Sequence, residues 1–308
     1  MRVTDPIYGW KYCMESGHVL NRRHDARAVE GFLIHHAGGY GCVQPWPVFG
    51  HPSLEDHWRA LADGVSLPLL DQALACAKQD AAARAAGLSW WQGLLVPLSH
   101  ATLTDLHGSL PQPAGIPFTH AKLKASLTDA AALHDWALRH PQLQLRLDFN
   151  EVPSMHDFDL WWRSLDDDLC RRIDWIEDPF PYDAVAWSAW QEKNGVSLAV
   201  DRAFSSAVMS ERSIAIWKPA WQALPSGCVI ENVVVTSAMD HPVGQAWAAH
   251  SAAQAGVRSL CGLRTDHLFS PDAFTERMGP WSPVWPALSG TGMGFDDLLE
   301  NIPWTRIR

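Results

Sequence analysis

Charged side chains recur at the ends of short apolar segments in the middle of the chain. The six of them are Lys122, Lys124, Asp148, Glu177, Asp201 and Lys218. Taken singly, each fits an ordinary solvent-facing charge, but recurrence at matching places on consecutive segments favours a common site. Three carboxylates placed together repel one another unless a cation lies between them. Because Mg²⁺ prefers oxygen ligands, the set predicts a site for a hard divalent cation with lysines on either side.

The apolar segments themselves predict a barrel of alternating strands and helices. Eight strand candidates cover residues 96–99, 121–124, 143–148, 173–178, 196–201, 214–218, 233–237 and 259–263. Helical patterns lie between most of them, as at 154–169, 183–194 and 243–255. Eight parallel strands close a (β/α) barrel, in which residues at the carboxyl ends of the strands form the active site. A doubly wound open sheet is the rival, but the glycine-rich phosphate loop typical of that fold is absent.

The flanking regions differ from this pattern. Residues 1–95 predict an α+β capping domain, with a strand at 29–36, a glycine-marked turn at 38–41, and helices at 53–63 and 68–86. Residues 96–270 form the predicted barrel domain. The Pro- and Trp-rich segment 271–308 is expected to pack back on the capping domain, which it completes.

Composition narrows the class of partner. The 308 residues carry a formal net charge of −10, and the chain has no basic tract, which argues against nucleic acid or an anionic membrane. No apolar run is long enough to span a bilayer, and residues 1–6 lack a secretory apolar segment. The six scattered cysteines indicate reduced thiols and a cytoplasmic location. The 17 tryptophans predict core and interface filling. Three of the six lysines lie at the strand ends described above.

The ordered set of strand-end residues resembles the enolase superfamily, in particular its muconate lactonizing subgroup. That pattern has Lys-x-Lys on the second barrel strand, Asp, Glu and Asp on the next three strands, and Lys on the sixth. The matching segments are Lys122-Leu123-Lys124, 145–150, 176–179, 200–201 and 217–219. Each short motif is weak alone, and the ordered series is strong.

Within the subgroup the chain is most similar to the o-succinylbenzoate synthases. The similarity lies in residues 120–124, in Arg146 and Asn150 around Asp148, and in residues 234–240 and 261–263. Some positions depart from the pattern: Gln44 stands where an acidic residue is more usual, Arg202 follows Asp201, and Arg264 replaces an Asp. The chain also lacks the Asp-x-Asp signature of dipeptide epimerases at the eighth strand.

The resemblance implies a reaction and a role for each residue. It implies Mg²⁺-dependent syn dehydration of 2-succinyl-6-hydroxy-2,4-cyclohexadiene-1-carboxylate through an enediolate, as in menaquinone biosynthesis, with Mn²⁺ as an alternative ion. Lys124 is then the base, Lys218 holds the intermediate from the opposite side, and Lys122 orients the carboxylate. The metal ligands are Asp148, Glu177 and Asp201. Substrate contacts or supporting positions fall to Arg146, Asn150, Asp178, Thr236, Ser237, Gly262, Arg22 and Arg23.

Other functions remain open at this level. The same lysines and metal would serve racemization of N-succinylamino acids, dipeptide epimerization or cycloisomerization. A Schiff-base aldolase needs a strand lysine but not three strand-end carboxylates. A non-catalytic barrel would be expected to have lost one of these groups, and none is missing. A small carboxylate is the expected substrate, and the oligomeric state is open, with a monomer plausible.

Overall fold

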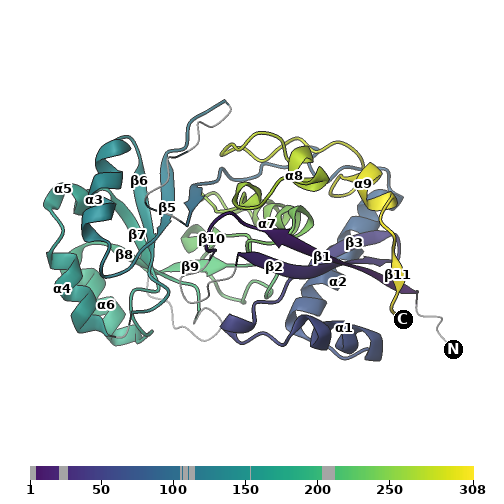
Figure 1. Ribbon diagram of the computed structural model, residues 1–308, viewed down its shortest axis with the longest axis horizontal. Helices are drawn as coiled ribbons and strands as arrows, with labels where there is room; N and C mark the ends of the chain where they lie inside the picture. Colours follow the sequence, from purple (N-terminus) through teal and green to yellow (C-terminus); the bar gives the residue numbers. More distant parts are fainter. Residues whose placement is uncertain are drawn as a thin grey trace.

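We describe the protein from a computed structural model that places residues 5–20, 27–104, 106, 110, 115–152, 154–202 and 212–308. The predicted contact residues Arg22 and Arg23 lie outside this described part of the chain. An antiparallel sheet with two helices lies beside a curled parallel sheet surrounded by helices (Figure 1). This is the predicted fold class, a (β/α) barrel with an α+β capping domain.

The capping sheet is built from an antiparallel meander. Its strands are β1 (Ile7–Glu15), β2 (Ala28–His36), β3 (Gly39–Val43) and the C-terminal β11 (Thr305–Arg306), in the order β11-β1-β2-β3. The turn between β2 and β3 is Ala37-Gly38, both at positive φ, which suits a two-residue hairpin. The predicted glycine turn at 38–41 is therefore wrong in part, because Gly39 and Gly41 belong to β3.

These two glycines let a helix lie unusually close to the sheet. A Cβ at Gly39 would fall 2.0 Å from the carbonyl oxygen of Ala77, and one at Gly41 would fall 2.2 Å from that of Ala73. Both carbonyls belong to α2 (Pro68–Ala85), which follows α1 (Leu54–Asp63). Only glycine permits this approach of backbone to backbone.

The parallel sheet provides the strand ends that carry the predicted site. Its strands are β4 (Ala101–Leu103), β5 (His120–Lys124), β6 (Gln144–Asp148), β7 (Ile173–Glu177), β8 (Ser197–Val200), β9 (Ile214–Trp217) and β10 (Val233–Val235), paired in that order. The predicted eighth strand is reduced to Cys261 and Gly262, which bridge Ser99 and Thr236 respectively. Cys261 and Gly262 thus connect the two edges of the sheet, next to β4 and β10.

The first barrel strand begins later than predicted. The sequence indicated 96–99, whereas β4 covers Ala101–Leu103 and only Ser99 joins the sheet before it, through one bridge. Pro97 offers no N–H for a ladder, which is consistent with the later start.

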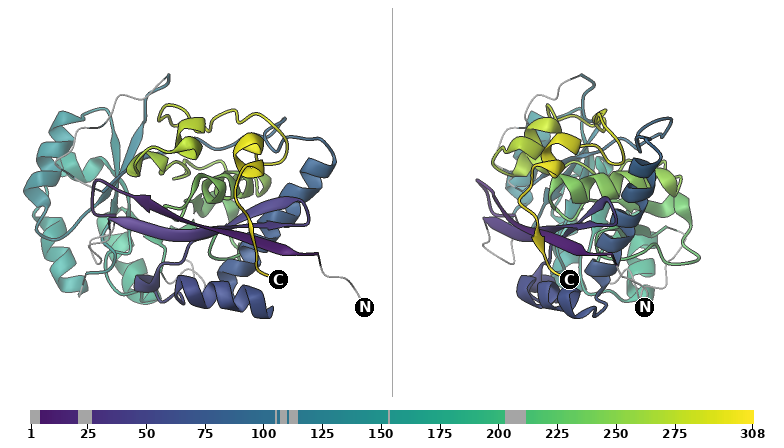
Figure 2. Two further views of the ribbon diagram at one scale, coloured as in Figure 1. Left: turned by 45° about the vertical axis from the view of Figure 1, so that its right-hand side comes forward. Right: turned by 90° about the vertical axis from the view of Figure 1, so that its right-hand side faces the viewer.

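Helices cover the outside of the parallel sheet (Figure 2). They are α3 (Ala130–Arg139), α4 (Met155–Arg163), α5 (Asp167–Arg171), α6 (Ala184–Asn194) and α7 (Pro242–Gln254). The single helix predicted at 154–169 is two helices, because Ser164 ends α4 and the Asp166 carboxylate caps α5 by accepting from the N–H of Leu169 at 2.7 Å. Among the described residues, no helix is long and apolar enough to cross a membrane.

The C-terminal segment returns to the capping domain. After α8 (Ala273–Arg277) and α9 (Asp296–Glu300), β11 pairs antiparallel with β1, near the N-terminal end of the chain (Figure 1). Buried Asp80 of α2 accepts from the N–H groups of both Tyr40 in β3 and Met293 in this segment. The Asp80 carboxylate thus connects α2, the capping sheet and the C-terminal segment.

Candidate active site

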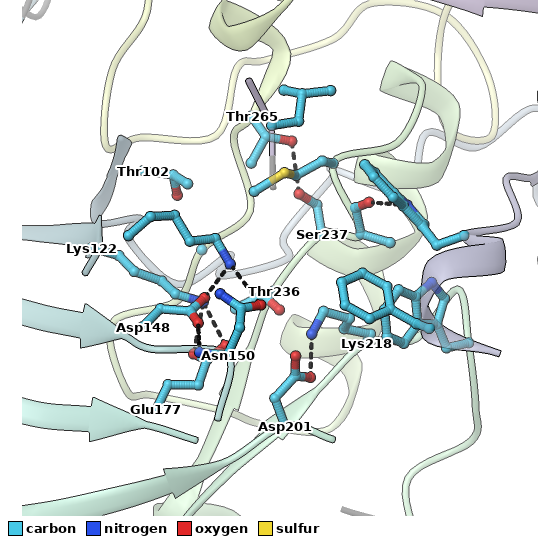
Figure 3. Close-up of a pocket in the computed structure, with 18 of the residues that line it drawn as sticks. Thr102, Lys122, Asp148, Asn150, Glu177, Asp201, Lys218, Thr236, Ser237 and Thr265 are labelled. Carbon is cyan, nitrogen blue, oxygen red and sulfur yellow. Dashed lines mark hydrogen bonds and ion pairs between the residues drawn. The ribbon is translucent and has the colours of Figure 1, made fainter. Parts of the chain in front are cut away.

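A pocket lies at the carboxyl ends of the barrel strands (Figure 3), and residues of the capping domain form part of its wall. The capping domain supplies Leu20, Trp46 and Phe49. Ten residues predicted from the sequence line it: Lys122, Lys124, Asp148, Asn150, Glu177, Asp201, Lys218, Thr236, Ser237 and Gly262. Two predicted residues, Arg146 and Asp178, are not in its wall.

Strand register brings the lysine pair against the carboxylates. Side chains of a strand alternate in direction, so Lys122 and Lys124 share one face of β5. Lys124 is level with Asp148 of β6, and Asp148 is level with Glu177 of β7. The Nζ of Lys122 lies 3.0 Å from Oδ2 of Asp148 and 2.7 Å from the Glu177 carboxylate. The Nζ of Lys124 lies 2.5 Å from Asp148 Oδ2 and 3.4 Å from Asn150 Oδ1.

The charges of this buried cluster shift one another's pKa values in different directions. Burial opposes the ammonium form of Lys122, but Asp148 and Glu177 outweigh it and raise its pKa. The pKa of Asp148 is lowered, because Lys122 and Lys124 overcome the effect of burial. In contrast, burial and the adjacent Asp148 charge raise the pKa of Glu177 to about 7. A further cation at this point would therefore be stabilised.

Lys218 and Asp201 form a second ion pair, at the opposite side of the pocket from Lys122 (Figure 3). The Lys218 ammonium also lies 4.7 Å from the ring centroid of Trp221, a cation–π contact. Asp178 acts behind this pair: its buried carboxylate accepts from the backbone N–H groups of Asp201, at 3.2 Å, and Arg202, at 3.1 Å. It holds the loop that carries Asp201.

The three carboxylates fit a hard cation in chemistry but are arranged as ion pairs. Within the described ranges, no three His, Cys, Asp or Glu side chains stand so that they hold a metal ion together. The ammonium of Lys122 lies between Asp148 and Glu177, where a cation is needed. A divalent ion with oxygen ligands would suit the same donors once Lys122 withdraws.

Arg146 lies below the pocket, inside the barrel. It donates to Asp174 Oδ2 at 2.8 Å and to the carbonyl of Leu260 at 2.7 Å, and its Nη1 lies 2.9 Å from Nδ1 of His100. His100 does line the pocket and was not singled out by the sequence. Because the first barrel strand was predicted at 96–99 and lies at Ala101–Leu103, the sequence did not indicate that the histidine between them faces the pocket.

Two residues of the capping domain fix the pocket wall and were also missed as contacts. Trp46 donates from Nε1 to the carbonyl of Ala238 at 3.0 Å, and Gln44 donates from Nε2 to that of Met239 at 2.9 Å. Tyr12 orients the Gln44 amide by donating to its Oε1 at 3.0 Å. Met239 has a φ of 53°, which its neighbours must hold in place. The sequence contained one indication of this contact. Gln44 stands where an acidic residue is more usual, and a carboxylate at that position would have no hydrogen to donate to Met239.

Arg264, the other notable departure, does not line the pocket. It is buried, pairs with Asp266 and donates to the carbonyls of Gly279 and Pro280. This position therefore joins the end of the barrel to the C-terminal segment.

Comparison with known proteins agrees with this geometry. Residues 7–83 match the family model described as O-succinylbenzoate synthase, N-terminal domain. An o-succinylbenzoate synthase of Bdellovibrio bacteriovorus is 27% identical over 326 residues, covering 96% of this chain and 97% of that protein. Among solved structures, a muconate lactonizing enzyme from Mucobacterium smegmatis, complexed with muconolactone, has a TM-score of 0.74 at 15% identity, with 96% of each chain covered. An o-succinylbenzoate synthase from Thermosynechococcus elongatus, with Mg in its active site, has a TM-score of 0.60 at 19% identity, covering 88% of this chain and 96% of that one.

The fold and the comparisons thus define an enzyme with the enolase-superfamily architecture, as the sequence predicted. Within that class, the resemblance to the o-succinylbenzoate synthases is confirmed by both the capping domain and a full-length relative.

Proposed function

We propose that the chain is an o-succinylbenzoate synthase, which removes water from 2-succinyl-6-hydroxy-2,4-cyclohexadiene-1-carboxylate. The observation that carries the proposal is the pocket itself, in which Lys122 and Lys218 lie on opposite sides of a set of three carboxylates and Lys124 pairs with one of them, Asp148 (Figure 3). Its support from outside the structure is the resemblance to a synthase along 96% of the chain. The product would enter menaquinone biosynthesis, and the six free cysteines suit a reducing cytoplasm.

Lys124 is the proposed base and acid. As a free amine it takes the proton from the ring carbon that bears the carboxylate, and the electron pair of that C–H bond passes into the carboxylate group. The pair then returns to form the ring double bond as the C–O bond to the hydroxyl breaks, and the Lys124 ammonium gives its proton to the departing oxygen. Water and an aromatic ring result, and Lys124 is an amine again. To start, its amine must leave the ion pair with Asp148.

The other lysines are proposed to bind and orient. Lys122, buried beside Asp148 and Glu177, directs its ammonium toward the ring carboxylate. Lys218 holds the opposite face of the ring, and Asp201 and Trp221 fix its ammonium in place. Asn150, at 3.4 Å from Lys124, is positioned to orient the amine once it is neutral.

Asp148, Glu177 and Asp201 are the proposed holders of Mg²⁺, with Mn²⁺ as an alternative ion. When bound, the ion would oppose the negative charge that develops on the carboxylate oxygens. The raised pKa of Glu177 supports this assignment, because a divalent cation would offset the Asp148 repulsion that contributes to it.

A second candidate is racemization of N-succinylamino acids. A two-base racemase requires lysines on opposite sides of one pocket. Lys124 and Lys218 both line this pocket, and each pairs with a different carboxylate, Asp148 and Asp201 respectively. The same enzyme can be assayed for both reactions.

The deciding experiment is an ultraviolet assay of the purified protein with the cyclohexadiene substrate and Mg²⁺, beside a polarimetric assay with N-succinyl amino acids. The proposal predicts formation of 2-succinylbenzoate. Racemization without dehydration would replace it with the second candidate, and neither activity would overturn both.

A further inference from the structure

The pocket has two chemically different ends. The charged end comes from strands β5 to β9 and holds the lysines and carboxylates. The other end comes from β4, β10 and the segment after Gly262, and it carries neutral donors. Figure 3 shows Thr102, Ser237 and Thr265 at this neutral end, away from Glu177 and Asp201. A substrate with an acid at one end and a separate oxygen-bearing arm would match both.

His100 is the neutral end's most constrained side chain. It directly precedes β4, only 1% of it is exposed, and its backbone N–H donates to the carbonyl of Cys261 at 2.7 Å. Arg146 Nη1 lies 2.9 Å from its Nδ1. Because a guanidinium can only donate, Nδ1 must be the acceptor, and the ring hydrogen is therefore on Nε2.

Arg146 is itself held rigidly, so this tautomer is fixed. Its guanidinium bonds to Asp174 and to the carbonyl of Leu260, and it lies 4.9 Å from the ring centroid of Trp175. Burial, followed by the charges of Arg146 and Lys122, lowers the pKa of His100 well below its ordinary value. The ring is thus a neutral donor at physiological pH.

The Nε2–H has no hydrogen-bond partner in the described part of the chain, and the same holds for the Thr236 hydroxyl. Leaving such a buried group unpaired is unfavourable, so an acceptor on a ligand would recover that free energy. Gly262 makes room for the His100 ring at this place. A Cβ there would fall 2.7 Å from His100 Nε2 and 3.0 Å from Thr236 Cγ2.

We propose that His100 is a substrate-binding residue, whose Nε2–H donates, beside the Thr236 hydroxyl, to an oxygen of the substrate's succinyl arm. This inference rests on the proposed function and assigns the neutral end of the pocket to that arm. The charged end takes the ring carboxylate. His100 can bind the oxygen of the succinyl arm as a neutral donor, because Arg146 and Lys122 already supply positive charge near its ring.

The test compares His100→Phe, which removes the donor, with His100→Gln, which keeps an N–H at a similar distance. His100→Phe is expected to raise KM about tenfold, the value of one neutral hydrogen bond, with a smaller change in kcat. His100→Gln should recover much of that loss. In calorimetric titrations, His100→Phe should weaken binding of 2-succinylbenzoate by the same factor but leave binding of benzoate, which lacks the succinyl arm, unchanged.

A second variant reaches the same N–H from the other side. Gly262→Ala should displace the His100 ring and raise KM, and the double variant with His100→Phe should be less than additive. His250→Phe is the matched control, because His250 is also buried but stacks on Trp90, 4.1 Å between centroids, outside the pocket. It should leave KM unchanged even if it lowers the melting temperature.

The outcomes are separable. Unchanged KM and product affinity in His100→Phe, with an active wild type, overturn the His100 assignment alone. Equal weakening of 2-succinylbenzoate and benzoate also overturns it, because that is the result of a general structural disturbance. A wild type that neither dehydrates the substrate nor binds 2-succinylbenzoate overturns the proposed function and, with it, this inference.

Discussion

At the scale of single residues, the site is a set of opposed charges whose neighbours decide their states. Lys122 and Lys124 differ in surroundings although they are two positions apart. Lys122 contacts two carboxylates and Lys124 contacts one, together with the Asn150 amide. Lys124 therefore has a single ion pair to break before its amine can reach a substrate, in agreement with its proposed role.

Replacing Lys124 by alanine is predicted to reduce kcat by at least about 10²–10⁴-fold, the usual contribution of a general base. Binding of 2-succinylbenzoate should stay within a few-fold of the wild type, since the other charged groups are retained. An ultraviolet assay measures kcat, and calorimetry measures the affinity for 2-succinylbenzoate. Substantial turnover by this variant would refute the assignment of the base.

A second residue-scale prediction concerns Asp240, which lies after β10 and outside the pocket wall. It is 1% exposed, and burial raises its pKa from 3.8 to about 7. The folded state therefore holds this proton more tightly than the unfolded state, so stability is lost as the pH rises from about 4 to about 7.

Asp240→Asn removes that titration. The variant's gain in unfolding free energy over the wild type should be larger at pH 8 than at pH 5, by up to about 3 kcal/mol, because only the part of the shift between pH 5 and pH 7 falls in this interval. Urea unfolding at the two pH values measures it. A difference that does not change with pH would show that Asp240 is ionised in the folded protein at pH 5.

At the scale of elements, the loop after β10 is shared between the two domains. Ala238 and Met239 line the pocket, and their carbonyls accept from Trp46 and Gln44 of the capping domain. The capping domain thus shapes the pocket wall through backbone contacts as well as covering it. The positive φ of Met239 makes the wall dependent on those contacts.

Gln44→Glu tests this dependence with almost no change in shape. The carboxylate cannot donate to Met239 and would face its carbonyl oxygen, so we expect a loss of about 1–3 kcal/mol in unfolding free energy. A raised KM should accompany it. Trp46→Phe removes the neighbouring N–H alone and should act in the same direction. Wild-type stability and KM in both variants would contradict the role of these contacts.

At the scale of the whole molecule, an acidic protein must admit an acidic substrate. The net charge of −10 repels a carboxylate at a distance, whereas the pocket gathers three of the six lysines. The tryptophans pack in the interior. Trp136 and Trp187 are fully buried, and the ring centroids of Trp90 and Trp247 lie 6.2 Å apart. Their excess reflects aromatic packing in the core and between domain surfaces.

Removal of divalent cations is predicted to stop turnover, and added Mg²⁺ should restore it. An ion bound by the folded protein alone also stabilises it, so saturating Mg²⁺ should raise the melting temperature by several degrees. Fluorescence-monitored melting with EDTA or Mg²⁺ checks this, and Asp148→Asn should diminish the shift. Full activity in EDTA would exclude the metal role.

The sequence by itself determined the order of the chemical groups along the chain. A period of two in Lys122-Leu123-Lys124, and carboxylates at the ends of successive apolar segments, suffice to predict a barrel and its reactive rim. These are local patterns, which the backbone converts directly into position on a strand.

Only the tertiary structure decided which groups distant in the sequence meet, because no local pattern in the sequence encodes these contacts. His100 meets Arg146 and Gly262, and Gln44 meets Met239, across separations that no sequence period encodes. The two-residue eighth strand and the later start of β4 follow likewise from closure of the sheet and from Pro97. Such contacts depend on how whole elements pack, and packing selects among many pairings that the sequence alone allows.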